Sequence, residues 1–536
     1  MTGLARALRL RTDTTIFFSA SALMVIFLAA LVVAPTAIGA FFESGRAWVV
    51  TNLGWFFILG VNAWLGFLIW VACSRHGHIV LGRTGSKPDF DNLSWFTMLF
   101  AGGIGTVLMF WGVAEPMSHF SSPPRDEVAP YSIEASQDAM AFALYHLGLH
   151  TWTIFTLPGL AFAYFIHRYD LPVRVSSVFY PLLKEGIHGP VGKAIDVAAI
   201  LGTLFGVAVS LGLGSSQIAA GLSELTGMEN TTWMRIGIIA VLTCVAVASI
   251  VAGLDSGVKL LSNINIGMAV ALMVFVLVTG STLFLLRGIV QTVGIYLGSL
   301  PELAFWNDML AYAHSSGGGW GWQGSWTVFY WAWTVTWSPF IGIFVARISR
   351  GRTIREFVMG VLLAPSAFTL IWFAIFGWQA MQIDGIGETA RAAMGDSAGE
   401  LSRAVSESVP LAMFAFFEHF PYTTLVQGFA VVIVAIFFAT SSDSASLVVD
   451  MLCTGEEKPG PVHQRVYWGV AEGTIAGMLI WLAGDAGLNA LQQVITVIGL
   501  PIFVLVFMMI PSLIKGLGAE DIEHVQIKDD PALEDM

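Results

Sequence analysis

The chain has 536 residues, of which 56% are hydrophobic and only 12% are charged. This composition, with a mean hydropathy of +0.74, excludes a soluble globular protein. The net charge of −12 is not that of a nucleic-acid-binding protein, so we expect no nucleic-acid partner. The cysteines, Cys73, Cys244 and Cys453, build no disulfide framework. We therefore predict an all-α polytopic protein in a lipid bilayer.

Apolar runs of about 20 residues recur along the chain, and each is long enough to cross the hydrocarbon core of a bilayer. The first run follows three arginines but is longer than the apolar core of a signal peptide, so we expect a retained helix. The predicted spans are 15–35, 52–73, 93–117, 139–165, 196–222, 234–253, 262–286, 326–346, 356–380, 423–447, 465–484 and 490–514.

Three segments between the spans are not predicted to cross. Residues 287–300, RGIVQTVGIYLGSL, are apolar but too short. They predict an interfacial helix or a contact between subunits. Residues 311–323, rich in glycine and tryptophan, and the acidic residues 384–408 are predicted outer loops.

Basic residues give the orientation of the spans. With the N-terminus inside, 19 of the 25 lysines and arginines fall in inner segments and only 6 fall in outer ones. Cytoplasmic loops of membrane proteins carry such an excess. We therefore expect a multi-pass protein of the cell inner (plasma) membrane with both termini in the cytoplasm.

The third span contains the stretch AGGIGTVLMFWGVAEP (101–116), in which Gly102, Gly103 and Gly105 fall within four residues. Each glycine weakens a helix by about 1 kcal/mol relative to alanine. One interpretation is a discontinuous helix whose free backbone groups bind a solute or an ion, as in transporters. The alternative is close packing of two helices, which small residues also permit.

The eighth span gathers tryptophans near its middle. Trp331, Trp333 and Trp337 are followed at once by Ser338 and Pro339, and a mid-span proline predicts a break in the helix. Spans three and eight would then both be interrupted, five spans apart. This matches a five-plus-five inverted repeat with the solute site at its interface.

The third-span stretch, the eighth-span tryptophans followed by SPF and ARISRGRTIRE, and the hydroxyl-rich tenth-span run TSSDSAS resemble the betaine/choline/carnitine transporter family. SVFYPLL, VSLGLG and the order of the spans fit as well. The resemblance covers about 15–515. It implies an all-α, leucine-transporter-like fold of twelve transmembrane helices and a secondary active transporter, often homotrimeric, that takes up betaine-type solutes by alternating access.

The same resemblance implies how the chain is divided. The implied parts are a cytoplasmic tail (1–14), two peripheral helices (15–92), a first inverted repeat (93–286), an interfacial helix with an outer loop (287–325), a second inverted repeat (326–514) and an acidic cytoplasmic tail (515–536). The short acidic tail is unlike the long basic tail of osmosensing relatives, so we expect no regulation of that kind.

A solute site built on aromatic rings is implied, because a quaternary ammonium is held by cation–π attraction. The implied substrate-binding residues are Gly103, Gly105, Val107, Trp111, Trp152, Phe155, Trp331, Trp333, Thr334 and Trp337.

This chain departs from the family in that aromatic site. Leu147 and Phe155 stand where the family usually has Trp and Tyr, and Thr334 replaces a further tryptophan. Val107 stands where choline-selective members carry an aspartate. We therefore expect a zwitterion of the glycine betaine, sulfonium or carnitine type, or one that is not a full quaternary ammonium. An amino acid or an aminosulfonate is the alternative.

A sodium site is implied as well, with sodium as the coupling ion and no other cofactor. Its ligands would be backbone oxygens of Ala101, Ile104 and Phe437 and the hydroxyls of Thr440 and Ser441. Hard cations prefer oxygen ligands of this sort. The alternative for the hydroxyls is hydrogen bonding to their own helix. A second sodium site is doubtful, because Val207 replaces a threonine.

A gate is implied at the inner mouth, where Arg347 and Asp443 would pair in the outward-facing state. Charged groups at membrane depth are costly and usually mark function.

Two other classes of membrane protein, a di-iron enzyme and a channel, fit the sequence less well. His146 and His150 lie four residues apart, but scattered histidines elsewhere do not suit a membrane di-iron enzyme, and paired broken helices do not suit a channel. We expect no enzyme.

Overall fold

The protein is described here by a computed structural model covering residues 2–83, 85–101, 104–252, 255–309, 321–484 and 488–528. Within these ranges the regular structure is helical and no strand occurs, apart from an isolated bridge between Val80 and Thr353. An all-helical membrane protein, as predicted, is confirmed.

In the described part of the chain, fourteen helices have at least 14 residues, and most of the predicted spans lie in them. These long helices are α2 (Thr14–Val33), α3 (Pro35–Cys73), α5 (Ile104–Ser121), α6 (Ile133–Leu147), α7 (Leu149–Phe162), α9 (Pro190–Thr226), α10 (Thr232–Ala252), α11 (Asp255–Thr279), α12 (Thr282–Phe305), α14 (Thr327–Ile348), α15 (Ile354–Asp384), α19 (Thr423–Thr454), α20 (Val462–Ala483) and α21 (Leu488–Lys528).

Shorter helices connect them. They are α1 (Thr2–Ala7), η1 (Arg75–His78), α4 (Asn92–Ala101), η2 (Ala163–Arg168), η3 (Ser176–Phe179), α8 (Tyr180–Leu183), η4 (Lys184–His188), α13 (Gly321–Ser325), α16 (Glu388–Met394), η6 (Gly395–Ser397), α17 (Glu400–Glu407), η7 (Val409–Leu411) and α18 (Ala412–Phe417).

Among the described residues, 11 helices are long and apolar enough to cross a membrane. The third predicted span is not one of them, because it is divided between α4 and α5, and Gly102 and Gly103 between these helices lie outside the described residues. The seventh is represented by a shorter apolar helix, Asn263–Thr279, within α11.

The boundary after the seventh span is wrong. We expected that span to continue to residue 286 and a short interfacial helix to follow, but α11 ends at Thr279 and α12 runs from Thr282 to Phe305. At 24 residues α12 is long enough to cross, so the premise that this segment is too short is also wrong. Gly280 separates the two helices.

Two other helices, α3 and α21, extend furthest beyond their predicted spans. The second predicted span begins at residue 52, whereas α3 begins at Pro35, where the fixed φ of proline suits a first helical position. The predicted acidic tail begins at residue 515, whereas α21 continues to Lys528. Hydropathy marks the part of a helix that lies in lipid and does not mark where its backbone stops being helical.

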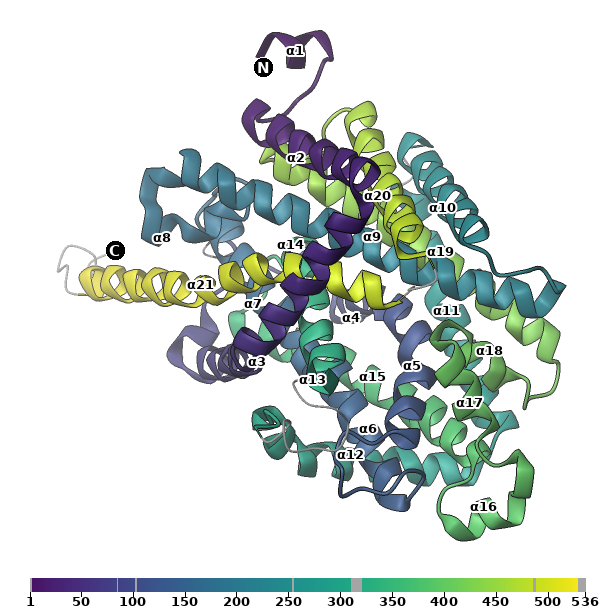
Figure 1. The fold of residues 1–536 in the computed structure, drawn as a ribbon. Coiled ribbons are helices and arrows are strands. Elements are labelled where there is room, and N and C mark those ends of the chain that lie inside the picture. Colours follow the sequence, from purple (N-terminus) through teal and green to yellow (C-terminus); the bar gives the residue numbers. More distant parts are fainter. Residues whose placement is uncertain are drawn as a thin grey trace.

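The helix α14 lies at the centre of the molecule (Figure 1) and packs against α7, α9 and α21. Nearly all of its side chains are buried, as are those of α7. A helix that is apolar on all sides belongs in the interior of a bundle. Segments distant in the sequence therefore meet along α14.

The predicted interruption of the eighth span is wrong, because α14 continues through Pro339 from Thr327 to Ile348. A proline has no N–H to bond the carbonyl four residues before it, here that of Val335. The hydroxyl of Ser338 donates to this same carbonyl at 2.7 Å. The carbonyl that proline leaves free thus has a partner within the helix.

A break occurs instead in the fourth span, at Gly148 between α6 and α7. A Cβ atom there would lie 2.5 Å from the carbonyl oxygen of Leu144, so only glycine fits. The hydroxyl of Tyr296 accepts a hydrogen bond from the Leu149 N–H at 3.1 Å, which satisfies a backbone donor freed by the break. We did not predict this interruption.

The loop after α14 contains the motif SRGRTIRE and is fastened to α4. The guanidinium of Arg352 lies 3.9 Å from the centre of the Trp95 ring and donates to the side-chain oxygen of Asn92 at 2.9 Å. Gly351 has φ +83°, and a Cβ atom there would meet the backbone of Lys87. Arg352 and Gly351 of this motif are therefore held by contacts beside the C-terminal end of α14.

We predict that Ser338→Ala destabilises the protein by about 1–3 kcal/mol, because the buried carbonyl of Val335 would lose its partner. Thermal unfolding of the purified protein measures the loss. Ser366→Ala is the matched control, since its hydroxyl donates to Leu362, a carbonyl that the helix already bonds. Equal melting temperatures for both variants would contradict the role given to Ser338.

Candidate functional site

A small enclosed cavity lies between α5, α6, α7 and α14. It offers about 30 Å³ to the centre of a water-sized sphere, and its walls are almost entirely apolar. The lining residues are Val107, Leu147, Thr151, Phe155, Trp333, Thr334 and Trp337. Five of the predicted substrate-binding residues are thus brought together here.

Two tryptophans of α14 form one wall. The Trp333 ring stacks on Phe329 with an interplanar angle of 11°, and its Nε1–H donates to Ser210 of α9 at 3.0 Å. Trp337 lies edge-on to Trp333, with ring centroids 6.2 Å apart. These contacts hold the rings in fixed positions before any solute enters.

Thr334, between these tryptophans, supplies the polar element of that wall. It lines the cavity, and its hydroxyl has no hydrogen-bond partner among the described residues. Thr151 on the opposite helix also lines the cavity, but its hydroxyl donates to the carbonyl of His146. Thr334 is therefore the lining hydroxyl that is free to donate to a solute, while Thr151 can still accept.

Thr151 was missed in the sequence, although a signal was present. Leu147, Thr151 and Phe155 follow one another at intervals of four residues, and all three line the cavity. Residues at this spacing share one face of a helix. Because Leu147 and Phe155 were predicted to lie at the solute site, Thr151, midway between them on the same helix face, could have been predicted there too.

Three other predicted tryptophans are buried away from the cavity. Trp152 lies edge-on behind Phe155, and Trp331 stacks against His150 at an interplanar angle of 12°. Trp111 packs edge-on against Trp326 of the neighbouring helix end. These rings support the helices around the cavity and do not line it.

Gly105 also lies elsewhere, against the ring of Phe437. A Cβ atom at this position would lie 2.0 Å from that ring, so the glycine permits α5 and α19 to approach closely. Both residues line a second, smaller cavity with Trp372. Close packing accounts for this glycine, while Gly103 lies outside the described residues.

The predicted sodium ligands lie on three helix segments near this approach. α4 ends at Ala101 and α5 begins at Ile104, while Phe437, Thr440 and Ser441 lie on α19. The Thr440 hydroxyl donates to the carbonyls of Ile436 and Phe437, at 2.9 and 3.1 Å. A back-bonded hydroxyl keeps its oxygen lone pairs, so ion binding stays a prediction.

The predicted gate residues do not form an ion pair with each other in this conformation. Arg347 is exposed at the end of α14, whereas Asp443 is buried and accepts a hydrogen bond from Ser249 at 2.7 Å.

Another acidic residue near Arg347 is Glu457, which lies on the loop after α19. A hydrogen bond from His167, together with the charge of Arg347 among others, holds the pKa of Glu457 below its ordinary value.

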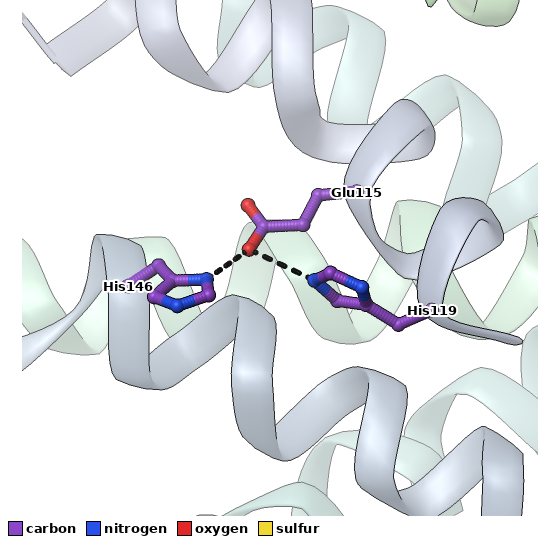
Figure 2. Close-up of side chains that lie close together, drawn as sticks. All are labelled: Glu115, His119 and His146. Carbon is purple, nitrogen blue, oxygen red and sulfur yellow. Dashed lines mark hydrogen bonds and ion pairs between the residues drawn. The ribbon is translucent and has the colours of Figure 1, made fainter. Parts of the chain in front are cut away.

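A buried polar cluster of Glu115, His119 and His146 lies beside the N-terminal part of α14, before the residues that line the cavity. Figure 2 shows the Glu115 carboxylate between the two imidazoles. Oε1 of Glu115 lies 2.6 Å from Nδ1 of His146 and 3.4 Å from Nε2 of His119. Its Oε2 accepts from the Tyr330 hydroxyl at 2.7 Å. Glu115 and His119, four residues apart in an apolar span, are a signal that we overlooked.

The fourth-span histidines take separate partners. His146 turns to Glu115, whereas Nε2 of His150 lies 3.0 Å from the side-chain oxygen of Asn62. The two imidazoles therefore do not face one ion together. This agrees with setting aside a di-iron centre on that pair.

Comparison with known proteins agrees with this architecture. The family model for the betaine/carnitine/choline family transporter matches residues 15–522. The chain is 44% identical to an ectoine/glycine betaine/proline transporter of Corynebacterium glutamicum, over 95% of this chain and 81% of that one. It is 39% identical to a glycine betaine transporter of Acinetobacter baylyi, over 96% of this chain and 75% of the relative.

A third relative covers nearly both full lengths. It is a probable glycine betaine transporter of Desulfitobacterium hafniense, 38% identical over 95% of this chain and 98% of its own. The matched region includes every helix around the cavity, from α5 to α19. The chain therefore belongs to the betaine/carnitine/choline family of membrane transporters.

Proposed function

We propose that this protein takes up a small zwitterionic solute by sodium-coupled alternating access. The observation that carries the proposal is the cavity beside α14, which Phe155, Trp333 and Trp337 line together with Thr334. Aromatic faces attract a cationic centre, and the hydroxyl can bond the polar end of a zwitterion. The names of the relatives, glycine betaine transporters among them, support a solute of this class.

The lining also favours a solute without net charge. No Asp, Glu, Lys or Arg is among the described residues that line the cavity, and Val107 occupies one wall. A buried net charge without a partner is costly, so a simple cation such as choline is disfavoured. Because one relative is named for ectoine and proline as well as betaine, a solute that is not a quaternary ammonium fits the reduced aromatic lining.

The twelve-span topology is part of this proposal. Counting the α4–α5 segment and α11 as spans, and α12 as an interfacial helix, reconciles the 11 apolar helices with the predicted spans. An even number puts both termini on one side, and the basic residues favour the cytoplasm. Contacts between α5 and α14, the corresponding helices of the two proposed repeats, support the inverted-repeat arrangement.

A homotrimer remains the proposed assembly. The helix α12 exposes Leu283, Leu286, Val290, Val293 and Leu297. An apolar surface of this kind is suited to lipid or to another subunit. The exposed side of α12 is thus consistent with a subunit contact.

The proposed sodium site lies where α4, α5 and α19 meet. The close approach of Gly105 to Phe437 brings the start of α5 to α19, the helix that carries Thr440 and Ser441. Movement of α5 against α19 would change the distances among these oxygens. Such a site can therefore couple ion binding to the conformation of the transporter.

We predict that changing Thr440 and Ser441 together to alanine raises the sodium concentration for half-maximal uptake about tenfold, a loss of about 1.4 kcal/mol. Uptake into proteoliposomes at varied sodium measures it. Thr474→Ala is the matched control, because this hydroxyl is back-bonded in the same way on α20. Wild-type uptake that is unchanged when potassium replaces sodium would contradict the coupling.

We predict that Thr334→Trp shifts preference toward quaternary ammonium solutes by about tenfold, because one more desolvated aromatic face contributes about 1–2 kcal/mol. Binding of glycine betaine and of proline to the purified protein gives the ratio. Thr334→Val, of similar shape, should weaken both solutes by removing the hydroxyl. If both variants bind as the wild type does, Thr334 is not part of the solute site.

We also propose that Arg347 and Asp443 pair in the outward-facing state. An interaction present in one state biases the equilibrium by its differential energy. Asp443→Ala should therefore increase labelling of a cysteine introduced at the inner end of α14 and reduce solute accumulation. The charge-swapped double variant, Arg347→Asp with Asp443→Arg, should restore part of the accumulation. If Asp443→Ala is labelled to the same extent as the wild type, Arg347 and Asp443 do not form a gate.

A further inference from the structure

The side chains of Glu115, His119 and His146 form a buried cluster of atoms that are typical metal ligands. Their side chains are at most 1% exposed, and no lysine or arginine pairs with the carboxylate among the described residues. The cluster lies apart from the cavity, none of whose lining residues it shares. We propose that these three side chains form a binding site for a divalent transition-metal ion of the zinc class.

The donor set suits such an ion. Imidazole and carboxylate are the ligands of zinc in sites with two histidines and one acidic residue, and such sites keep a fourth position open. One ligand atom from each of the three residues lies within 4.8 Å of the others. A tetrahedral ion with bonds of about 2.1 Å holds its ligand atoms about 3.4 Å apart.

Two of the three separations within the cluster involve Oε1 of Glu115, and both lie within about 1 Å of that value. Nε2 of His119 lies 3.4 Å from Oε1 of Glu115, which is long for a hydrogen bond and suitable for two ligands of one ion. Nδ1 of His146, at 2.6 Å from the same oxygen, has to move outward by less than about 1 Å. Glu115 and His119 are four residues apart on α5, so one helix face presents both.

The outer partners of these ligands are those of a metal site. Nε2 of His146 lies 2.9 Å from the Thr327 hydroxyl, which fixes the ring so that Nδ1 faces the carboxylate. Tyr330 donates to the second oxygen of Glu115. Ligating histidines and carboxylates are held in this way by a second layer of hydrogen bonds.

Hydrogen bonds within the protein do not satisfy both ring nitrogens of His119. Its Nδ1 is buried without a partner among the described residues, and its Nε2 has only the long contact to Glu115. Leaving buried polar atoms unsatisfied costs about 1–3 kcal/mol each. A bound ion would give Nε2 a ligand bond in place of this long contact and would neutralise the carboxylate, although it would not satisfy Nδ1.

Occupation of the site would fasten three helices together. The ligands come from α5 and α6, and the second layer comes from α14, while Trp322 and Trp326 pack on His119 with ring centroids 5.2 and 4.5 Å apart. Once bound, the ion should oppose any motion of α5 against α14.

Cobalt(II) titration of the purified, full-length protein tests the proposal, because tetrahedral cobalt has intense visible absorption and reports its ligands. We expect one tight site per chain that zinc displaces. His119→Gln should weaken zinc binding by at least about 100-fold, since loss of an outer partner alone costs about 10–100-fold. His150→Gln, another fully buried histidine outside the cluster, should leave the affinity unchanged.

His119→Cys provides a test that does not depend on loss of function. A thiolate at this position is also a zinc and cobalt ligand, so binding should persist and a thiolate-to-cobalt charge-transfer band should appear. Zinc should also slow solute uptake by the wild type and not by His119→Gln. The same cobalt spectrum and affinity in wild type, His119→Gln and His119→Cys would overturn the proposal, as would absence of tetrahedral cobalt from the wild type.

Discussion

The need to satisfy polar groups where water is absent governs the interior of this protein. Lipid and apolar side chains offer no hydrogen bonds, so each buried carbonyl or carboxylate depends on a protein partner. Glu472 on α20 accepts from Ser442 and Ser446 of α19, at 2.9 and 3.2 Å. Glu115 on α5 accepts from Tyr330 of α14. These bonds give direction to contacts among helices whose apolar surfaces alone would pack in many ways.

The same requirement explains which parts of the fold could be predicted. Hydropathy located almost every helix, because crossing a bilayer demands a long apolar run. It could not decide whether α14 breaks at Pro339, since the answer depends on Ser338 bonding the carbonyl that proline leaves free. The break at Gly148 depends on Tyr296, a residue of another helix, and nothing in the local sequence announces such a partner.

Helical geometry separates the site residues that meet from those that do not. Trp333, Thr334 and Trp337 lie on one side of α14, because residues one and four positions apart are about 100° and 40° apart around a helix. Trp331, two positions before Trp333, is about 200° away and packs on His150 instead. Positions around the helix thus place Trp331 on another side of α14 from the cavity. The closeness of α5 to α14, however, is a property of the fold alone.

The distribution of charge separates recognition from coupling. The walls of the cavity carry rings and hydroxyls but no ionised side chain, whereas the buried acids Glu115, Asp443 and Glu472 lie outside it. A zwitterion can therefore enter without leaving a net charge unpaired against these walls. The close contact of Gly105 with Phe437 leaves no room between α5 and α19, so a displacement of either helix at this point has to be accommodated by the other.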